Sequence, residues 1–187
     1  MEILKTRTSS IDLQCRLIRI ALFCYVATEV VFFVLAWIVP SPITIGTFSM
    51  ELTPKGMTME QLHAMLPAQH LLGTLLGLPA LLLLGYALWQ LDGMLRGFQK
   101  NAMFAENTIR HLHAFAGAGF LSITLSIFEV PLRILLDPVV MGTPMNRMSF
   151  GMTSDELFAL LLCGLFYLIA GMMHEGRRLK QEVEEFV

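Results

Sequence analysis

The stretch from Leu112 to Leu136 reads LHAFAGAGFLSITLSIFEVPLRILL, and it decides the fold. As a helix it is long enough to cross the hydrocarbon core of a bilayer, which needs about 20 apolar residues. Within it, Glu129 and Arg133 stand one helical turn apart, at a depth where lipid-facing charge is heavily penalised. We therefore expect both side chains to face protein or water inside a polytopic membrane protein.

Three further apolar runs, at 17–39, 71–91 and 157–173, have the length of membrane-spanning helices. Only 15% of the residues are charged, against about 25% in a soluble domain, and the mean hydropathy is +0.64. The first run exceeds the core of a signal peptide and lacks a small-residue cleavage pattern, so we interpret it as an uncleaved anchor. The sequence predicts an all-α, integral membrane bundle of four transmembrane helices, with residues 1–187 as a single membrane domain.

Composition also excludes several classes of site. Cys15, Cys24 and Cys163 have no metal-ligand spacing, which argues against a zinc site and a disulfide framework. The net charge of −2 and the lack of a basic patch with interleaved aromatic residues argue against direct nucleic-acid binding. No nucleophile-and-base set, phosphate-cradling glycine loop or H-E-x-x-H pattern occurs, so we expect no catalytic site and no enzyme activity.

The distribution of basic residues predicts the orientation, because cytoplasmic flanks carry an excess of lysine and arginine. Ten basic residues flank the runs on one side: Lys5, Arg7, Arg16, Arg19, Arg96, Lys100, Arg110, Arg177, Arg178 and Lys180. The other two connections hold only Lys55 and Arg147. We therefore expect both termini to be cytoplasmic (N-in/C-in), together with the loop 92–111 and the tail 174–187.

Small and polar residues mark the inward faces of three helices. In the third run they recur at three-and-four spacing, as Gly119, Ser122, Ser126, Glu129 and Arg133. The fourth run repeats the pattern with Gly164, Tyr167, Gly171 and His174, and the second has Gly73, Gly77 and Ala80. Because small residues let helices approach closely, we interpret the glycines as packing positions.

A second buried carboxylate, Glu29, lies near the centre of the first run, one turn after Tyr25. At that depth it should be neutral or partnered by a hydroxyl or a cation. We define a candidate polar core as Glu29, Glu129, Arg133 and Tyr167. Three interpretations stay open: a structural ion pair, a site for binding or proton movement, and contact of Arg133 with lipid headgroups at the outer interface.

The loop between the second and third runs is a candidate interaction site. Phe98, Phe104, Glu106, Asn107 and Arg110 either dock a cytoplasmic protein or only anchor the loop at the membrane and cap the next helix. The first reading predicts that Phe104 is an aromatic anchor for a partner.

The loop and the tail also resemble a known family. The residues concerned are Gly97-Phe98, Phe104-Ala105-Glu106-Asn107, Arg110-His111-Leu112 and Glu175-Gly176-Arg177-Arg178-Leu179. They are similar to the signature of the bacterial membrane family known as domain of unknown function 2975. Members of that family resemble this chain over nearly its whole length. The chain departs from the family at Asn101-Ala102-Met103, where Gly-x-Pro is frequent, and at Phe186. The resemblance implies a multi-pass protein of the bacterial cytoplasmic membrane, and relatives encoded beside helix-turn-helix regulators suggest a cytoplasmic regulator as partner.

The exterior connections are rich in methionine: Met57, Met59, Met65, Met141, Met145, Met148 and Met152. Thioethers bind Cu(I), but methionine more often fills apolar gaps, so we assign no metal and no cofactor.

The favoured function is a non-enzymatic interaction or regulatory subunit. The alternative is a small carrier or proton-coupled exporter using Glu29, Glu129 and Arg133, as a homo-oligomer because four helices enclose little space. A polar cavity reaching Glu29 favours the carrier, and a tightly packed core favours the interaction role.

Overall fold

The computed structural model describes residues 2–38, 43–45, 48–50, 52–99, 105–141 and 152–185. The elements in this part of the chain are α1 (Glu2–Ile38), β1 (Ile43–Ile45), β2 (Phe48–Met50), α2 (Met59–Ala64), α3 (Pro67–Gln99), α4 (Glu106–Met141) and α5 (Ser154–Glu185). Within it, α1, α3, α4 and α5 are long and apolar enough to cross a membrane, which confirms the predicted helical class. The short antiparallel hairpin β1–β2 pairs Ile43 with Met50 and is not predicted by the sequence.

The long helices continue beyond the apolar runs. Helix α3 extends to Gln99 and α4 begins at Glu106, so most of the segment 92–111 is helical. Helix α5 likewise continues through the charged tail to Glu185. The extension of α5 is rich in Arg, Lys, Glu and Gln, which are good helix formers in water.

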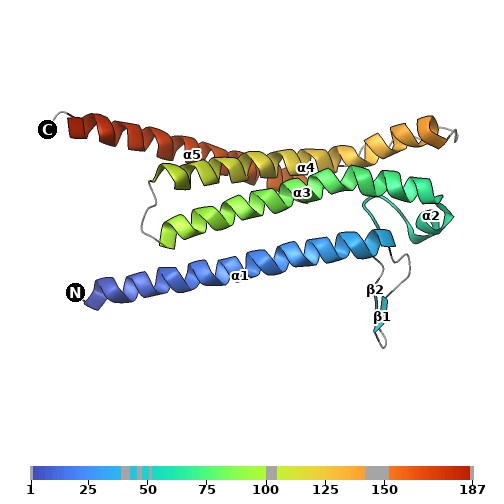
Figure 1. Cartoon of the computed structure of the whole chain (residues 1–187), viewed down its shortest axis with the longest axis horizontal. Helices are drawn as coiled ribbons and strands as arrows, with labels where there is room; N and C mark the ends of the chain where they lie inside the picture. The colour runs from blue at the N-terminus through green and yellow to red at the C-terminus, as the bar shows by residue number, and fades with distance from the viewer. Residues whose placement is uncertain are drawn as a thin grey trace.

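The four long helices form an open row. Among the described residues, the backbones of α1 and α3, of α3 and α4, and of α4 and α5 come close together (Figure 1), whereas α3 and α5 meet only through side chains such as Met94 and Ala170. The sequence predicts a bundle of four transmembrane helices but not this order of neighbours. In the most apolar windows of α1 and α5, only 11% of the residues are buried, so most of these two edge helices is left for lipid or another protein.

Glycines set the close approach of α1 to α3. A Cβ on Gly73 would overlap the Trp37 ring, and a Cβ on Gly77 would lie 2.9 Å from the Phe33 ring. Both aromatic rings thus lie directly over the α3 backbone near the outer end predicted for the helices. The packing interpretation of Gly73 and Gly77 is confirmed.

Helix α5 packs on α4 through a different set of residues than the sequence predicts. Ala170 lies in a buried cluster with Met94 and Leu112, and the Cys163 sulfur lies 3.1 Å from the Cβ position of Gly119. A Cβ on Gly164 or Gly171 would meet nothing within 4 Å, so the packing interpretation of these two glycines is wrong. They occupy the face of α5 that looks away from α4.

Both ends of the described chain lie at the same end of the molecule. The start of α1, the end of α3, the start of α4 and the end of α5 gather there, while α2 and the β1–β2 hairpin lie at the opposite end (Figure 1). The basic residues of these helix ends therefore share one side, as the predicted topology requires. Lys55 lies in the segment that leads to α2, at the opposite side.

Candidate functional site

The Glu129–Arg133 pair on α4 is buried and fixes a loop at the predicted outer end. The Arg133 Nη1 atom lies 3.7 Å from Glu129 Oε1, and Arg133 is only 3% exposed. Its Nη2 atom donates a hydrogen bond of 3.0 Å to the backbone carbonyl of Lys55. Arg133 therefore binds protein groups instead of reaching the outer interface.

Gly56 allows the loop to cover this pair. Its φ of +71° lies in the left-handed region that glycine adopts without strain. A Cβ at Gly56 would lie 3.3 Å from the Val130 side chain and 4.0 Å from Arg133 Nη2. The chain can therefore turn tightly over α4 and present the Lys55 carbonyl to Arg133.

The Lys55 side chain connects this loop with α4 and α5. Its Nζ atom lies 3.2 Å from the Ser126 carbonyl oxygen and 3.4 Å from Ser126 Oγ, and it forms an ion pair with Glu156. Burial lowers the pKa of Lys55, and the nearby Glu129 carboxylate opposes this only in part. The ammonium is therefore costly at this position and depends on its acceptors.

Glu156 has two roles at the start of α5. Its amide donates to Thr153 Oγ1 at 3.3 Å, and its Oε2 accepts from the Thr153 amide at 2.8 Å, which together form a capping box. Its Oε1 binds Lys55. The sequence pattern indicates the cap but gives no signal for the ion pair, because the partner lies in a distant loop.

Glu29 and Glu129 line the same cavity. This cavity has a volume of about 330 Å³ and lies between α1, α3, α4 and the segment 52–55. Lys55, Ser122 and Ser126 also line it. We call it the carboxylate cavity. Because this cavity is polar and reaches Glu29, it favours the carrier alternative over the interaction role.

Glu29 also borders an apolar groove. The groove has a volume of about 610 Å³, runs between α1 and α3, and is lined mainly by aliphatic and aromatic side chains. The Tyr25 hydroxyl donates a hydrogen bond to the Glu29 carboxylate. Within the described ranges Glu29 forms no ion pair, whereas Glu129 and Glu156 each have a basic partner. Glu29 thus stands where the apolar groove meets the carboxylate cavity.

Tyr167 lies apart from these residues. It is 54% exposed on α5, and its ring contacts the His113 ring with centroids 4.0 Å apart. The carboxylate cavity does not include it. The prediction that Tyr167 belongs to the polar core is wrong, because α5 turns its Cys163 and Ala170 face toward α4 and leaves Tyr167 at the side.

The predicted interaction loop is only partly available for docking. Phe98 is partly buried and packs against the cluster of Met94, Leu112 and Ala170, so its ring is engaged within the protein. Glu106 is exposed and lies 3.2 Å from Arg177 of α5.

The start of α4 also differs from the predicted cap. Asn107 and Arg110 are exposed, and Asn107 lies inside the first turn because α4 begins at Glu106. Phe104, the proposed aromatic anchor, lies outside the described residues. The docking prediction for this loop therefore stays a prediction.

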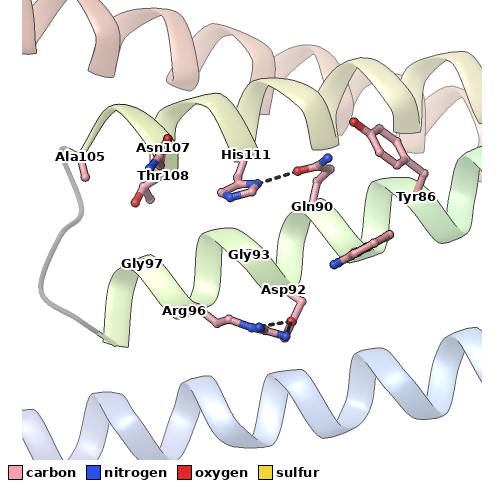
Figure 2. A pocket seen from close by; sticks show the side chains of 11 residues that line it. Tyr86, Gln90, Asp92, Gly93, Arg96, Gly97, Ala105, Asn107, Thr108 and His111 are labelled. Carbon is pink, nitrogen blue, oxygen red and sulfur yellow. Dashed lines mark hydrogen bonds and ion pairs between the residues drawn. The ribbon is translucent and has the colours of Figure 1, made fainter.

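A second charged site lies near the other end of the row. Asp92 of α3 is 5% exposed and pairs with Arg19 of α1 at 2.5 Å and with Arg96 of α3 at 2.6 Å. On the α4 side, the His111 ring lies 2.6 Å from Gln90 (Figure 2). In the sequence, Arg19 and Arg96 indicate only the topology. The spacing of four residues between Asp92 and Arg96 is the sequence signal for their ion pair.

No three His, Cys, Asp or Glu side chains in the described part of the chain lie close enough together to hold a metal ion. Comparison with protein-family models, curated proteins and solved structures found no match. The resemblance to the family domain of unknown function 2975 therefore rests on the quoted residues alone and stays a prediction. What the site itself offers is a carboxylate, Glu29, that faces both a polar cavity and an apolar groove.

Proposed function

We propose that this chain is a non-enzymatic, multi-pass protein of the bacterial cytoplasmic membrane, with both termini inside, that acts as a small carrier for cations. The observation that carries this proposal is that Glu29 and Glu129, from α1 and α4, line one cavity. The sequence alone favours an interaction subunit. The cavity favours the carrier function over the interaction role, because an ion pair that only stabilises the fold needs no cavity beside it.

The charges around the cavity favour a cation or a proton as its ligand. Arg133 pairs with Glu129, and Lys55 pairs with Glu156. Within the described residues, Glu29 has the Tyr25 hydroxyl as its polar partner. A cation bound at Glu29 would therefore complete the charge balance, and a proton could take the place of the cation when the site is empty.

The walls of the site favour a cation that carries an apolar body. Phe32, Phe33 and Trp37 line the carboxylate cavity beside Glu29, and aromatic faces attract organic cations. The adjoining groove between α1 and α3 is apolar and large enough for a hydrophobic substituent. Together they describe a site for a lipophilic amine or quaternary ammonium ion.

The contacts near the two ends of α1 provide a way to change which side of the membrane has access to Glu29. Near one end, Trp37 lies over Gly73, and near the other, Arg19 pairs with Asp92. Glu29 lies between these contacts along α1. Opening one contact while the other is held would expose the site to one side of the membrane at a time. Because α1 packs only on α3 among the described helices, little other packing opposes such a movement.

The open row also supports a homo-oligomeric carrier. The carboxylate cavity has walls from α1, α3 and α4, and α5 contributes none of its lining residues. A second copy packed against the exposed faces of the edge helices would enclose the site further.

Binding of tetraphenylphosphonium to the purified protein in detergent tests this proposal by isothermal titration calorimetry. We expect the wild type to bind and Glu29→Gln to lose at least tenfold in affinity, because the amide removes the charge but keeps the shape. Glu60→Gln is the matched control, since Glu60 is exposed in α2 and lines neither the carboxylate cavity nor the apolar groove. Equal affinity of the wild type and a well-folded Glu29→Gln variant would remove the carrier proposal.

The interaction role is the second candidate, and the exposed start of α4 favours it. Glu106 and Arg177 join the exposed ends of α4 and α5 into one charged surface, with Asn107 and Arg110 beside it. A cytoplasmic regulator is the partner that the resemblance implies. Its test is a pull-down from membranes carrying Phe104→Ala, which should lose a cytoplasmic protein that the wild type recovers.

A further inference from the structure

The pairing around Asp92 leaves an excess of positive charge at one end of the row. Two guanidinium groups, from Arg19 and Arg96, share the single carboxylate of Asp92. The Asp92 side chain is almost fully buried, but 57% of the Arg96 side chain remains exposed. Asp92 therefore orients the Arg96 guanidinium without covering it, so that further donors remain free to bind an anion.

Two cavities meet at this charged group. The first has a volume of about 530 Å³, lies between α3 and the start of α4, and carries polar side chains from Gln90, Asn107, Thr108 and His111 (Figure 2). The second, of about 240 Å³, lies between α1 and α3. Its apolar walls come from Leu22, Phe23, Val26 and Leu88. Trp89, Asp92 and Arg96 line both cavities.

We propose that this junction is a binding site for an anionic phospholipid, with the phosphate at Arg96, the polar headgroup toward Gln90 and Asn107, and an acyl chain in the apolar cavity between α1 and α3. A soluble anion would use the polar cavity alone. A phospholipid is the ligand class whose charged and apolar parts match both cavities at once.

The position of the site agrees with this ligand. Trp89 is 73% exposed beside Arg96, as is typical of aromatic residues at a membrane interface. Anionic lipids attract basic residues at the cytoplasmic surface, where the excess of basic residues places this end. Glu29 lines neither cavity, although Val26, Leu88 and Trp89 also border the groove beside Glu29. Lipid retention is therefore measured separately from binding of organic cations.

Native mass spectrometry of the delipidated protein tests the inference. Phosphatidylglycerol and phosphatidylcholine with identical acyl chains are titrated in parallel, and we expect the wild type to retain phosphatidylglycerol more tightly. Arg96→Gln should reduce this preference about fivefold. Arg178→Gln is the matched control, because Arg178 is an exposed arginine of α5 that lines neither cavity, and it should keep the preference.

Two further measurements separate the headgroup from the acyl chain. Val26→Trp fills the apolar cavity and should weaken retention of both lipids, while Arg96→Lys keeps the charge and should retain most of the preference. Three results would overturn the proposal. These are equal retention of the two lipids by the wild type, equal effects of Arg96→Gln and Arg178→Gln, and displacement of the lipid by glycerol phosphate at equal concentration, which would indicate a soluble anion instead.

Discussion

At the scale of single residues, the charged side chains around the carboxylate cavity fall into two groups with different roles. Arg133 and Lys55 bind carboxylates and backbone or hydroxyl oxygens, and these contacts join the loop before α2 to α4 and α5. Glu29 has a hydroxyl partner and faces open volume on two sides. The first group stabilises the structure, and Glu29 is the residue that remains available for a ligand.

We predict that Arg133→Gln destabilises the protein strongly. The change leaves the Glu129 carboxylate beside a neutral partner at membrane depth and removes the charge-assisted bond to the Lys55 carbonyl. Breaking a buried pair in this way costs about 3 kcal/mol. Thermal unfolding in detergent should show a lower midpoint for Arg133→Gln than for the wild type. Arg110→Gln is the control on the same helix, since replacing an exposed arginine should change stability by less than about 0.5 kcal/mol. Equal midpoints for the two variants would show that the pair is not a structural element.

The candidate site could be predicted from the sequence only in part. The depth of Glu29 and the four-residue spacing of Glu129 and Arg133 indicate buried polar residues, because lipid excludes them. Lys55 could not be found in this way, since a lysine in a loop has no periodicity that reports a tertiary contact. Tyr167 was placed wrongly because its spacing to small residues on α5 resembles an inward face.

At the scale of elements, the glycines of α3 decide how closely α1 can approach. Gly73 and Gly77 lie under the Trp37 and Phe33 rings, whereas a Cβ at Gly85 would meet nothing within 4 Å. All three glycines belong to the same helix, and only the first two are needed for contact with α1.

We predict opposite effects for alanine at two of these positions. Gly73→Ala should force Trp37 away from α3 and destabilise the protein by about 1–3 kcal/mol, as overpacking does. Gly85→Ala should be neutral or stabilising by up to about 1 kcal/mol, because alanine favours helix more than glycine does. Thermal unfolding of both variants, with Trp37 fluorescence in a Trp89→Phe background, measures each effect. A loss at Gly85 as large as that at Gly73 would contradict the assigned contact.

The existence of the four long helices could be predicted, but their order in the row could not. Apolar length marks a membrane-spanning helix whatever its neighbours are. Lipid and a neighbouring helix are equally apolar, so the apolar face of α5 does not reveal that its main neighbour is α4. For the same reason Gly164 and Gly171, on the outward face of α5, looked like packing positions.

At the scale of the whole molecule, the two ends of the row differ in charge and structure. The helix ends that carry most of the basic residues lie together, and the β1–β2 hairpin and α2 lie at the other end (Figure 1). This arrangement is what a protein with an even number of membrane crossings requires.

We predict that the basic end faces the cytoplasm. In a cysteine-free background, a membrane-impermeant maleimide added outside intact spheroplasts should label Glu60→Cys and leave Glu182→Cys unlabelled, because the excess of lysine and arginine remains inside. Both positions are exposed, so burial does not decide the result. Labelling of Glu182→Cys from outside would reverse the proposed topology.

Transport in proteoliposomes tests the carrier account most directly. The purified protein is reconstituted with an outward-directed proton gradient, and uptake of tetraphenylphosphonium is followed in parallel for the wild type, Glu29→Gln and Glu60→Gln. The account predicts uptake that collapses with the proton gradient for the wild type and for Glu60→Gln, and uptake at the level of protein-free vesicles for Glu29→Gln. Equal uptake by the wild type and Glu29→Gln, or no uptake by a well-folded wild type, would contradict it.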